Sequence, residues 1–197
     1  MVSRPAVSLF LASIIVLGFA SRSTAQDAAP VPDRDPFGEG AIGIEFGGAA
    51  MGELWNLNDR REWLADGSAA VWWNFTRRAT FLTEFHATRI WQTPNRDAFV
   101  NGLLLAVRWR LIERGSAALF VEAGPGISWS DTRTPPRGTT FNYLIEGSVG
   151  WTRQLGPRTR FITSARLLHI SNKGREGREH NPDIEAIGGY AGLAIAF

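Results

Sequence analysis

The chain ends with residues 184–197, Ile-Glu-Ala-Ile-Gly-Gly-Tyr-Ala-Gly-Leu-Ala-Ile-Ala-Phe. Alternate residues of a β-strand point to opposite sides. One face of this stretch therefore carries Phe197, Ile195, Leu193, Ala191, Gly189, Ile187 and Glu185. An alternating strand that ends in an aromatic residue is typical of the last strand of an outer-membrane β-barrel. The stretch therefore predicts a barrel that crosses a membrane with strands.

Seven segments upstream show the same two-residue period. They cover 40–50, 68–77, 79–91, 98–111, 117–129, 140–153 and 159–171. Segments of this length suit strands that cross a bilayer at a tilt. An even number of strands closes into an antiparallel barrel. The predicted fold class is therefore all-β, an eight-stranded antiparallel transmembrane β-barrel formed by residues 40–197.

The connections between these segments alternate in length. Three are tight turns, at 77–78, 112–116 and 154–158, and four are longer and polar, at 51–67, 92–97, 130–139 and 172–183. Outer-membrane barrels have short turns on the periplasmic side and long loops outside. The pattern therefore predicts which end of the barrel faces the cell exterior.

The parity of each segment predicts which side chains face lipid. In 117–129, Leu119 and Val121 lie on one face and Glu122 on the other. The same rule places Ile145, Leu193 and Ile195 on the lipid side, and Glu84, Glu122, Glu146, Arg108 and Arg166 in the lumen. Eight strands leave an interior that side chains fill, so we expect no diffusion pore.

The tryptophans support a membrane location. Trp91 and Trp129 lie at the outer ends of their segments, and Trp109 and Trp151 lie at the inner ends. This arrangement predicts the two aromatic girdles of a membrane barrel. The alternative is a soluble β-sandwich or a lipocalin-like barrel, which would not need so many apolar residues opposite the charged face.

The N-terminus has the features of a secretory signal peptide. Arg4 precedes an apolar run at 7–20, and Ser23-Thr24-Ala25 fits the small-x-small rule for cleavage. A helix needs roughly 20 apolar residues to span a bilayer, which argues against a membrane anchor here. We expect residues 1–25 to be removed, residues 26–39 to form a flexible periplasmic lead-in, and the product to insert in the outer membrane.

Composition narrows the partners and cofactors. Without Arg4 and Arg22 of the signal segment, the chain has 19 basic and 19 acidic residues, which gives no argument for nucleic-acid binding. The chain has no cysteine, so thiol chemistry, disulfides and cysteine-based metal sites are excluded. No metal-ligand spacing is evident, and we expect neither a metal nor a cofactor.

A base, a hydroxyl and a carboxylate lie near the predicted outer rim. His169 and Ser171 share the lipid-facing side of 159–171, and Glu185 has the lipid-facing parity of 184–197. Polar groups are costly on that side, and catalysis on a lipid would explain them. His169 can take the proton of Ser171 as it attacks an ester, and Glu185 can orient the imidazole. The spacing alone also fits a histidine and a serine at the end of a strand.

Other polar residues have less specific patterns. Asn172, Asn181 or the backbone amides around Gly174 are candidate donors to an oxyanion. His86 has the lumen parity and is expected to be an interior residue. His180 lies in a charged loop and is expected to be solvated.

The run His169-x-Ser171-Asn172, followed by Asn181, Glu185 and a Gly-rich terminal strand, resembles the signature of the PagL family of outer-membrane lipid A 3-O-deacylases. The strand layout covers the whole mature chain, and the motif covers residues 169–185. The resemblance implies His169 as base, Ser171 as nucleophile and Glu185 as orienting acid. It also implies a substrate, the ester-linked 3-hydroxyacyl chain at the 3-position of lipid A in outer-leaflet lipopolysaccharide.

Two features depart from the family pattern. The loop 173–180 is longer and more charged than usual in the family, and Asp183 stands where a glycine is common. Both bear on the position of Glu185 and on the oxyanion geometry. With lipid A as the substrate, basic loop residues become candidate phosphate contacts, although a solvated loop tip explains them equally well. These residues are Lys173, Arg175 and Arg178, with Arg133 and Arg137 in the preceding loop.

Two other functions fit the same barrel. A non-enzymatic adhesin or membrane-stabilising barrel would not require His169, Ser171 and Glu185 to converge. An outer-membrane phospholipase would share the chemistry but needs dimerisation and a calcium site, for which the sequence shows no carboxylate cluster. The sequence leaves the formation of a homodimer open.

Overall fold

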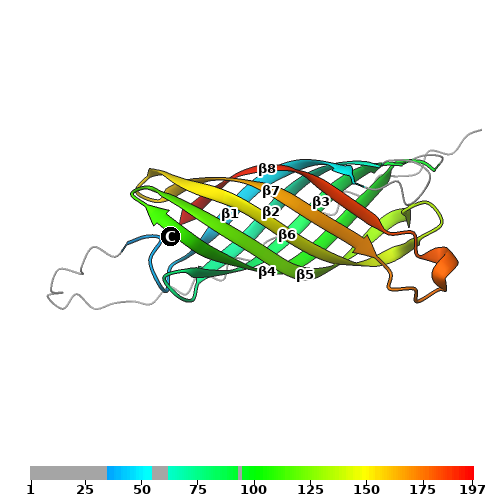
Figure 1. Cartoon of the computed structure of the whole chain (residues 1–197), viewed down its shortest axis with the longest axis horizontal. Coiled ribbons are helices and arrows are strands. Elements are labelled where there is room, and N and C mark those ends of the chain that lie inside the picture. Colours follow the sequence, from blue (N-terminus) through cyan, green and yellow to red (C-terminus); the bar gives the residue numbers. More distant parts are fainter. Residues whose placement is uncertain (1–34, 55–61, 93–94) are drawn as a thin grey trace, which may run out of the picture. The chain divides into compact units, whose positions relative to one another are not determined.

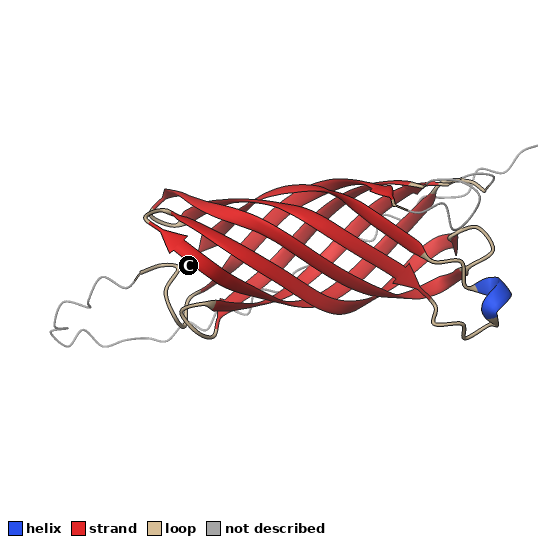
Figure 2. Cartoon of the chain, in the orientation of Figure 1, coloured by secondary structure: helices blue, strands red, loops and turns tan. Residues whose placement is uncertain are grey.

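The computed structural model describes residues 35–54, 62–92 and 95–197, and their strands form a closed antiparallel barrel (Figures 1 and 2). The eight strands are β1 (Ile42–Glu53), β2 (Trp63–Asn74), β3 (Ala79–Trp91), β4 (Ala98–Arg114), β5 (Ala117–Thr134), β6 (Thr139–Gly156), β7 (Thr159–Ser171) and β8 (Ile184–Ala196). Each pairs with its neighbours in the sequence, and β1 pairs with β8. The predicted fold class is confirmed.

Both ends of one expected loop are strand. The sequence places a loop at 51–67, whereas β1 continues to Glu53 and β2 begins at Trp63. The outward positions at the start of β2 include Ala65 and Gly67, whose small side chains hide the alternation. Backbone pairing with β1 and β3 nevertheless continues through this segment.

The two ends of the barrel differ as predicted. The turns at 75–78, 115–116 and 157–158 lie at one end, and the strand ends that flank 54–62, 92–97, 135–138 and 172–183 lie at the other. The connection between β5 and β6 is shorter than expected because both strands extend into it. One short 3-10 turn, η1 (Arg178–His180), lies in the last connection. None of the helices in the described ranges is long and apolar enough to cross a membrane.

Charged side chains pair inside the barrel. The Arg108 guanidinium contacts Glu45 through Nη1 at 2.8 Å and Glu122 through Nε at 2.6 Å. Arg166 contacts Glu146 through Nε at 3.0 Å and Glu84 through Nη1 at 3.3 Å. Such pairing is needed because an unpaired buried charge is very costly. The predicted lumen residues are all buried, and the predicted lipid-facing residues Leu119, Val121, Ile145, Leu193 and Ile195 are all exposed.

The tryptophans also lie where parity predicts. Trp91, Trp129, Trp109 and Trp151 are all exposed on the outer face. Trp63 and Trp73 add to the two bands, since they lie at opposite ends of β2 and are exposed. This arrangement agrees with aromatic girdles at both membrane interfaces.

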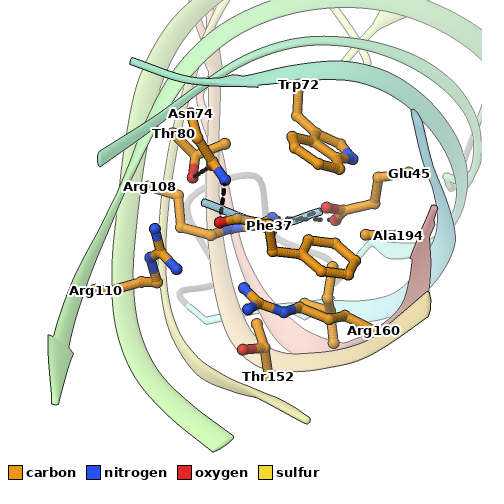
Figure 3. A pocket seen from close by; sticks show the side chains of 11 residues that line it. Phe37, Glu45, Trp72, Asn74, Thr80, Arg108, Arg110, Thr152, Arg160 and Ala194 are labelled. Atoms are coloured by element: carbon orange, nitrogen blue, oxygen red, sulfur yellow. Dashed lines mark hydrogen bonds and ion pairs between the residues drawn. The ribbon is translucent and has the colours of Figure 1, made fainter. Parts of the chain in front are cut away.

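Phe37, near the start of the described chain, lines a pocket at the inner end of the lumen (Figure 3). Phe37 is buried against the Trp72 ring, with ring centroids 5.6 Å apart, and its own ring lies 4.1 Å from the Arg160 guanidinium carbon. The Asn74 side-chain amide donates to the Phe37 carbonyl oxygen at 2.7 Å. The sequence treats 26–39 as a flexible lead-in, whereas its described part, 35–39, includes a residue packed inside the barrel.

Candidate active site

The pairing of β7 with β8 brings the expected acid and base together. His169 and Glu185 are direct cross-strand partners, and Ser171 lies two residues after His169 at the end of β7. On the other side of β7, Ile145 of β6 pairs with His169 and Tyr143 pairs with Ser171. The candidate site therefore lies on three neighbouring strands near the outer rim.

The three side chains have the connectivity of a catalytic triad. The His169 Nε2 atom lies 3.1 Å from the Ser171 Oγ atom, within hydrogen-bond distance. On the opposite side of the ring, Nδ1 lies 3.6 Å from the Glu185 Oε1 atom, an ion-pair distance that is long for a hydrogen bond. Catalytic contacts are often looser before substrate binds.

Exposure distinguishes the three residues. The side chains of His169 and Glu185 are 32% and 40% exposed, as expected for groups on the outer face. Ser171 is buried, although its parity predicts an outward position. It is the last residue of β7, and the chain turns there into the 172–183 loop. The strand pattern alone did not predict this burial.

The 172–183 loop is tied back to the end of β7 by its asparagines. The Asn172 backbone N–H donates to the Asn181 Oδ1 atom, and the Asn172 Nδ2 atom donates to the His180 carbonyl oxygen. The Gly174 N–H donates to the Asn172 Oδ1 atom. Asn172 directly follows Ser171, and the Asn181 side chain contacts the Asn172 backbone. The Gly174 N–H and the Asn172 backbone N–H already have acceptors within the loop.

Asp183 ends the loop and extends this network. The Asn181 Nδ2 atom donates to the Asp183 Oδ1 atom at 2.8 Å. Partial burial raises the pKa of the Asp183 carboxyl above its ordinary value, the charge of His169 opposes this shift, and the charge of Glu185 adds to it. Asp183 therefore lies within electrostatic range of both triad members.

Two of the predicted basic residues, Lys173 and Arg175, contact Tyr143. The Lys173 Nζ atom lies 4.7 Å from the centroid of the Tyr143 ring, and the Arg175 Nη1 atom lies 3.4 Å from the Tyr143 hydroxyl. Beside them, a groove of about 440 Å³ is lined by Thr139, Thr140, Phe141, Asn172, Arg175 and Glu176. Arg133 is exposed near the end of β5, Arg137 is exposed in the connection that follows, and neither lines this groove. The side chain of Arg178 lies outside the described part of the chain.

The other histidines lie outside the triad. The His86 Nδ1 atom lies 3.1 Å from the Asp66 Oδ2 atom inside the barrel, as its parity predicts. His180 is partly buried in the loop, and its Nδ1 atom lies 3.2 Å from the Glu176 carbonyl oxygen.

Inside the barrel, the structure shows a carboxylate cluster that the sequence did not reveal. Glu84, Glu122 and Glu146 have carboxylate oxygens within 4.8 Å of one another. They come from β3, β5 and β6, so their spacing along the chain carries no signal. Each contacts Arg108 or Arg166, which supply the neutralising charge.

Comparisons with known proteins agree with this geometry. A family model described as "Lipid A 3-O-deacylase (PagL)" matches residues 54–194. Among solved structures, the outer membrane enzyme PagL has a TM-score of 0.57 and 15% identity, covering 76% of this chain and 97% of that one. Neisserial surface protein A has a TM-score of 0.59 and 13% identity, covering 81% and 100%. No curated protein matches the sequence.

The structural neighbours establish the fold, which enzymes and other surface proteins share. The family match covers most of the barrel, including the strands and the loop that carry His169, Ser171 and Glu185. A closed barrel with an apolar outer face and a charged interior is built for the outer membrane. The chain is therefore an outer-membrane β-barrel that belongs to the PagL family of lipid A 3-O-deacylases.

Proposed function

We propose that this protein is a serine esterase that removes the ester-linked 3-hydroxyacyl chain from the 3-position of lipid A. The observation that carries the proposal is the contact of the His169 Nε2 atom with the Ser171 Oγ atom, with Glu185 beside the other ring nitrogen. A non-enzymatic barrel needs no such convergence. Family membership supplies the substrate class.

The geometry supports a two-step hydrolysis. His169 takes the Ser171 proton as Oγ attacks the ester carbonyl, and Glu185 stabilises the imidazolium that forms. Collapse of the tetrahedral intermediate breaks the ester bond, and His169 returns the proton to the departing sugar hydroxyl. Water then attacks the acyl-enzyme with His169 as base, which releases the 3-hydroxy fatty acid and restores Ser171.

Asn172 and Asn181 are the proposed oxyanion donors. Each side-chain amide has two N–H groups, and the loop contacts described above use one in each residue. The second N–H of either amide is therefore the proposed donor to the oxyanion. Donors fixed in place before the reaction stabilise developing charge without reorganisation.

Substitution of the triad tests the proposed function. Ser171→Ala and His169→Ala should each reduce lipid A 3-O-deacylation by about 10³-fold or more, because nucleophile and base act as one unit. Glu185→Ala should reduce it less, and the double Ser171→Ala, His169→Ala variant should lose little more than either single one. Mass spectrometry of lipid A treated with refolded variants measures this, with the exposed Ser116→Ala as control. Full loss of the 3-linked chain with Ser171→Ala would exclude the assignment.

We also propose that Lys173 and Arg175 contact the phosphates of lipid A. Both cations contact Tyr143, the cross-strand partner of Ser171, and the groove lined by Arg175 has room for a sugar headgroup. The double Lys173→Ala, Arg175→Ala variant should raise KM several-fold and leave kcat nearly unchanged. The exposed Arg153→Ala at the inner end is the matched control. An unchanged KM with phosphorylated lipid A would contradict this contact.

A further inference from the structure

Asp183 occupies a position of the loop that no proposed step uses. It directly precedes β8 and lies two residues before Glu185, the cross-strand partner of His169. Its side chain is partly buried at the edge of the site. The chain thus places a second carboxylate next to the triad, and its contacts indicate what that group does.

Two hydrogen bonds of the Asn181 side chain, one of them to Asp183, determine how its amide is oriented. A carboxylate only accepts hydrogen bonds, so the Asn181 Nδ2 atom must face Asp183. The Asn172 backbone N–H only donates, so the Asn181 Oδ1 atom must face Asn172. The two contacts agree on one of the two possible amide orientations. Without the Asp183 acceptor, only the contact with the Asn172 N–H favours this orientation of the amide.

We propose that Asp183 is a positioning residue of this site, which locks the Asn181 amide against the backbone of Asn172, the residue after Ser171. The catalytic consequence rests on the proposed esterase function, whereas the effect on the amide does not. A glycine at this position provides no acceptor, whereas an asparagine keeps one. The two variants Asp183→Asn and Asp183→Gly therefore isolate the hydrogen bond to Asn181.

The first experiment needs no activity. In refolded protein, the side-chain NH2 signals of Asn181 are followed by NMR for slow hydrogen exchange and a fixed chemical shift. Wild type and Asp183→Asn, which keeps an acceptor oxygen, should both show an ordered amide. Asp183→Gly should show faster exchange and averaged shifts, and the exposed Glu179→Gln control should match wild type. An equally ordered Asn181 amide in Asp183→Gly would overturn the positioning role.

The second experiment reads out catalysis. Asp183→Asn keeps an acceptor for the Asn181 amide and should have a kcat close to that of wild type. Asp183→Gly should show a fall in kcat of about 10-fold, with KM little changed. Equal kcat values for wild type and Asp183→Gly would refute the catalytic consequence of this position. An inactive wild type would refute the esterase function and leave the NMR result standing.

Discussion

Two buried carboxyl groups meet at the outer mouth of the barrel. The Glu62 backbone N–H donates to the Glu53 Oε2 atom at 3.2 Å, and both side chains are buried. Burial, followed by contact with Glu53 and its charge, raises the pKa of Glu62 from 4.5 to about 8. Leu54, the residue after Glu53, donates its N–H to the Glu185 carbonyl oxygen at 2.7 Å. The carboxyl pair therefore lies next to the segment that holds Glu185, the proposed triad acid.

The raised pKa of Glu62 predicts a pH-dependent stability. Between pH 4.5 and about 8, the folded protein holds a proton that the unfolded chain releases. This contribution is therefore present below pH 4.5 and declines as the pH rises to about 8. Glu62→Gln should abolish this decline, so that the variant gains stability relative to wild type across the window. Urea unfolding midpoints in detergent between pH 4 and 9 measure the difference.

A control and a contrary outcome complete the test. Glu39→Gln removes an exposed carboxyl near the other end of the barrel and should parallel wild type at every pH. A constant difference between Glu62→Gln and wild type from pH 4 to 9 would show that Glu62 does not titrate in this window.

At the scale of one strand, β4 shows how alternation matches the membrane. Its outward side chains run from Phe99 through Leu103 and Leu105 to Trp109 and Leu111, and all are exposed. Between them, Arg108 and Arg110 are buried. Phe99 and Trp109 lie toward the two ends of the strand, so Leu105 faces the middle of the bilayer.

Depth along β4 should determine the cost of a charge. Leu105→Arg should destabilise the barrel by about 2 to 4 kcal/mol, because the guanidinium would face hydrocarbon near the midplane. Leu111→Arg has the same parity but lies beyond Trp109, and should cost about 1 kcal/mol or less. Reversible unfolding in lipid vesicles compares the two. Equal costs would mean that Leu105 does not face the bilayer interior.

For the whole molecule, the interior ion pairs join strands that are far apart in the sequence. Arg166 of β7 contacts Glu84 of β3 and Glu146 of β6, and its guanidinium carbon lies 3.9 Å from the centroid of the Tyr190 ring of β8. Its side chain is only 1% exposed. The removal of one arginine thus leaves two buried carboxylates without their main partner.

Arg166→Leu should therefore destabilise the barrel by about 3 to 5 kcal/mol. The exposed Arg153→Leu on β6 removes the same charge at the surface and should change stability little. Replacing Glu84 and Glu146 with glutamine in the Arg166→Leu background should recover part of the loss, because no buried charge is then unpaired. Urea unfolding measures all three variants, and equal effects of Arg166→Leu and Arg153→Leu would contradict the role of the network.

The sequence by itself determined most of the strands, the facing of their side chains and the shared parity of His169, Ser171 and Glu185. These follow from a local rule, since alternate residues of a strand point to opposite sides whatever the strand pairs with. The resemblance of a short motif added the family. Where outward residues were small, as at Ala65 and Gly67, the rule had no contrast to detect, and the first residues of β2 were assigned to a loop.

Only the tertiary structure decided which of these residues meet. Barrel closure gathers Glu84, Glu122 and Glu146 from three strands, and it buries Phe37 in the inner mouth. The path of the 172–183 loop buries Ser171 and brings Asn181 to Asn172, with Asp183 beside it. The physical reason is that cross-strand register, barrel closure and loop path depend on contacts between distant segments, which a two-residue period does not encode.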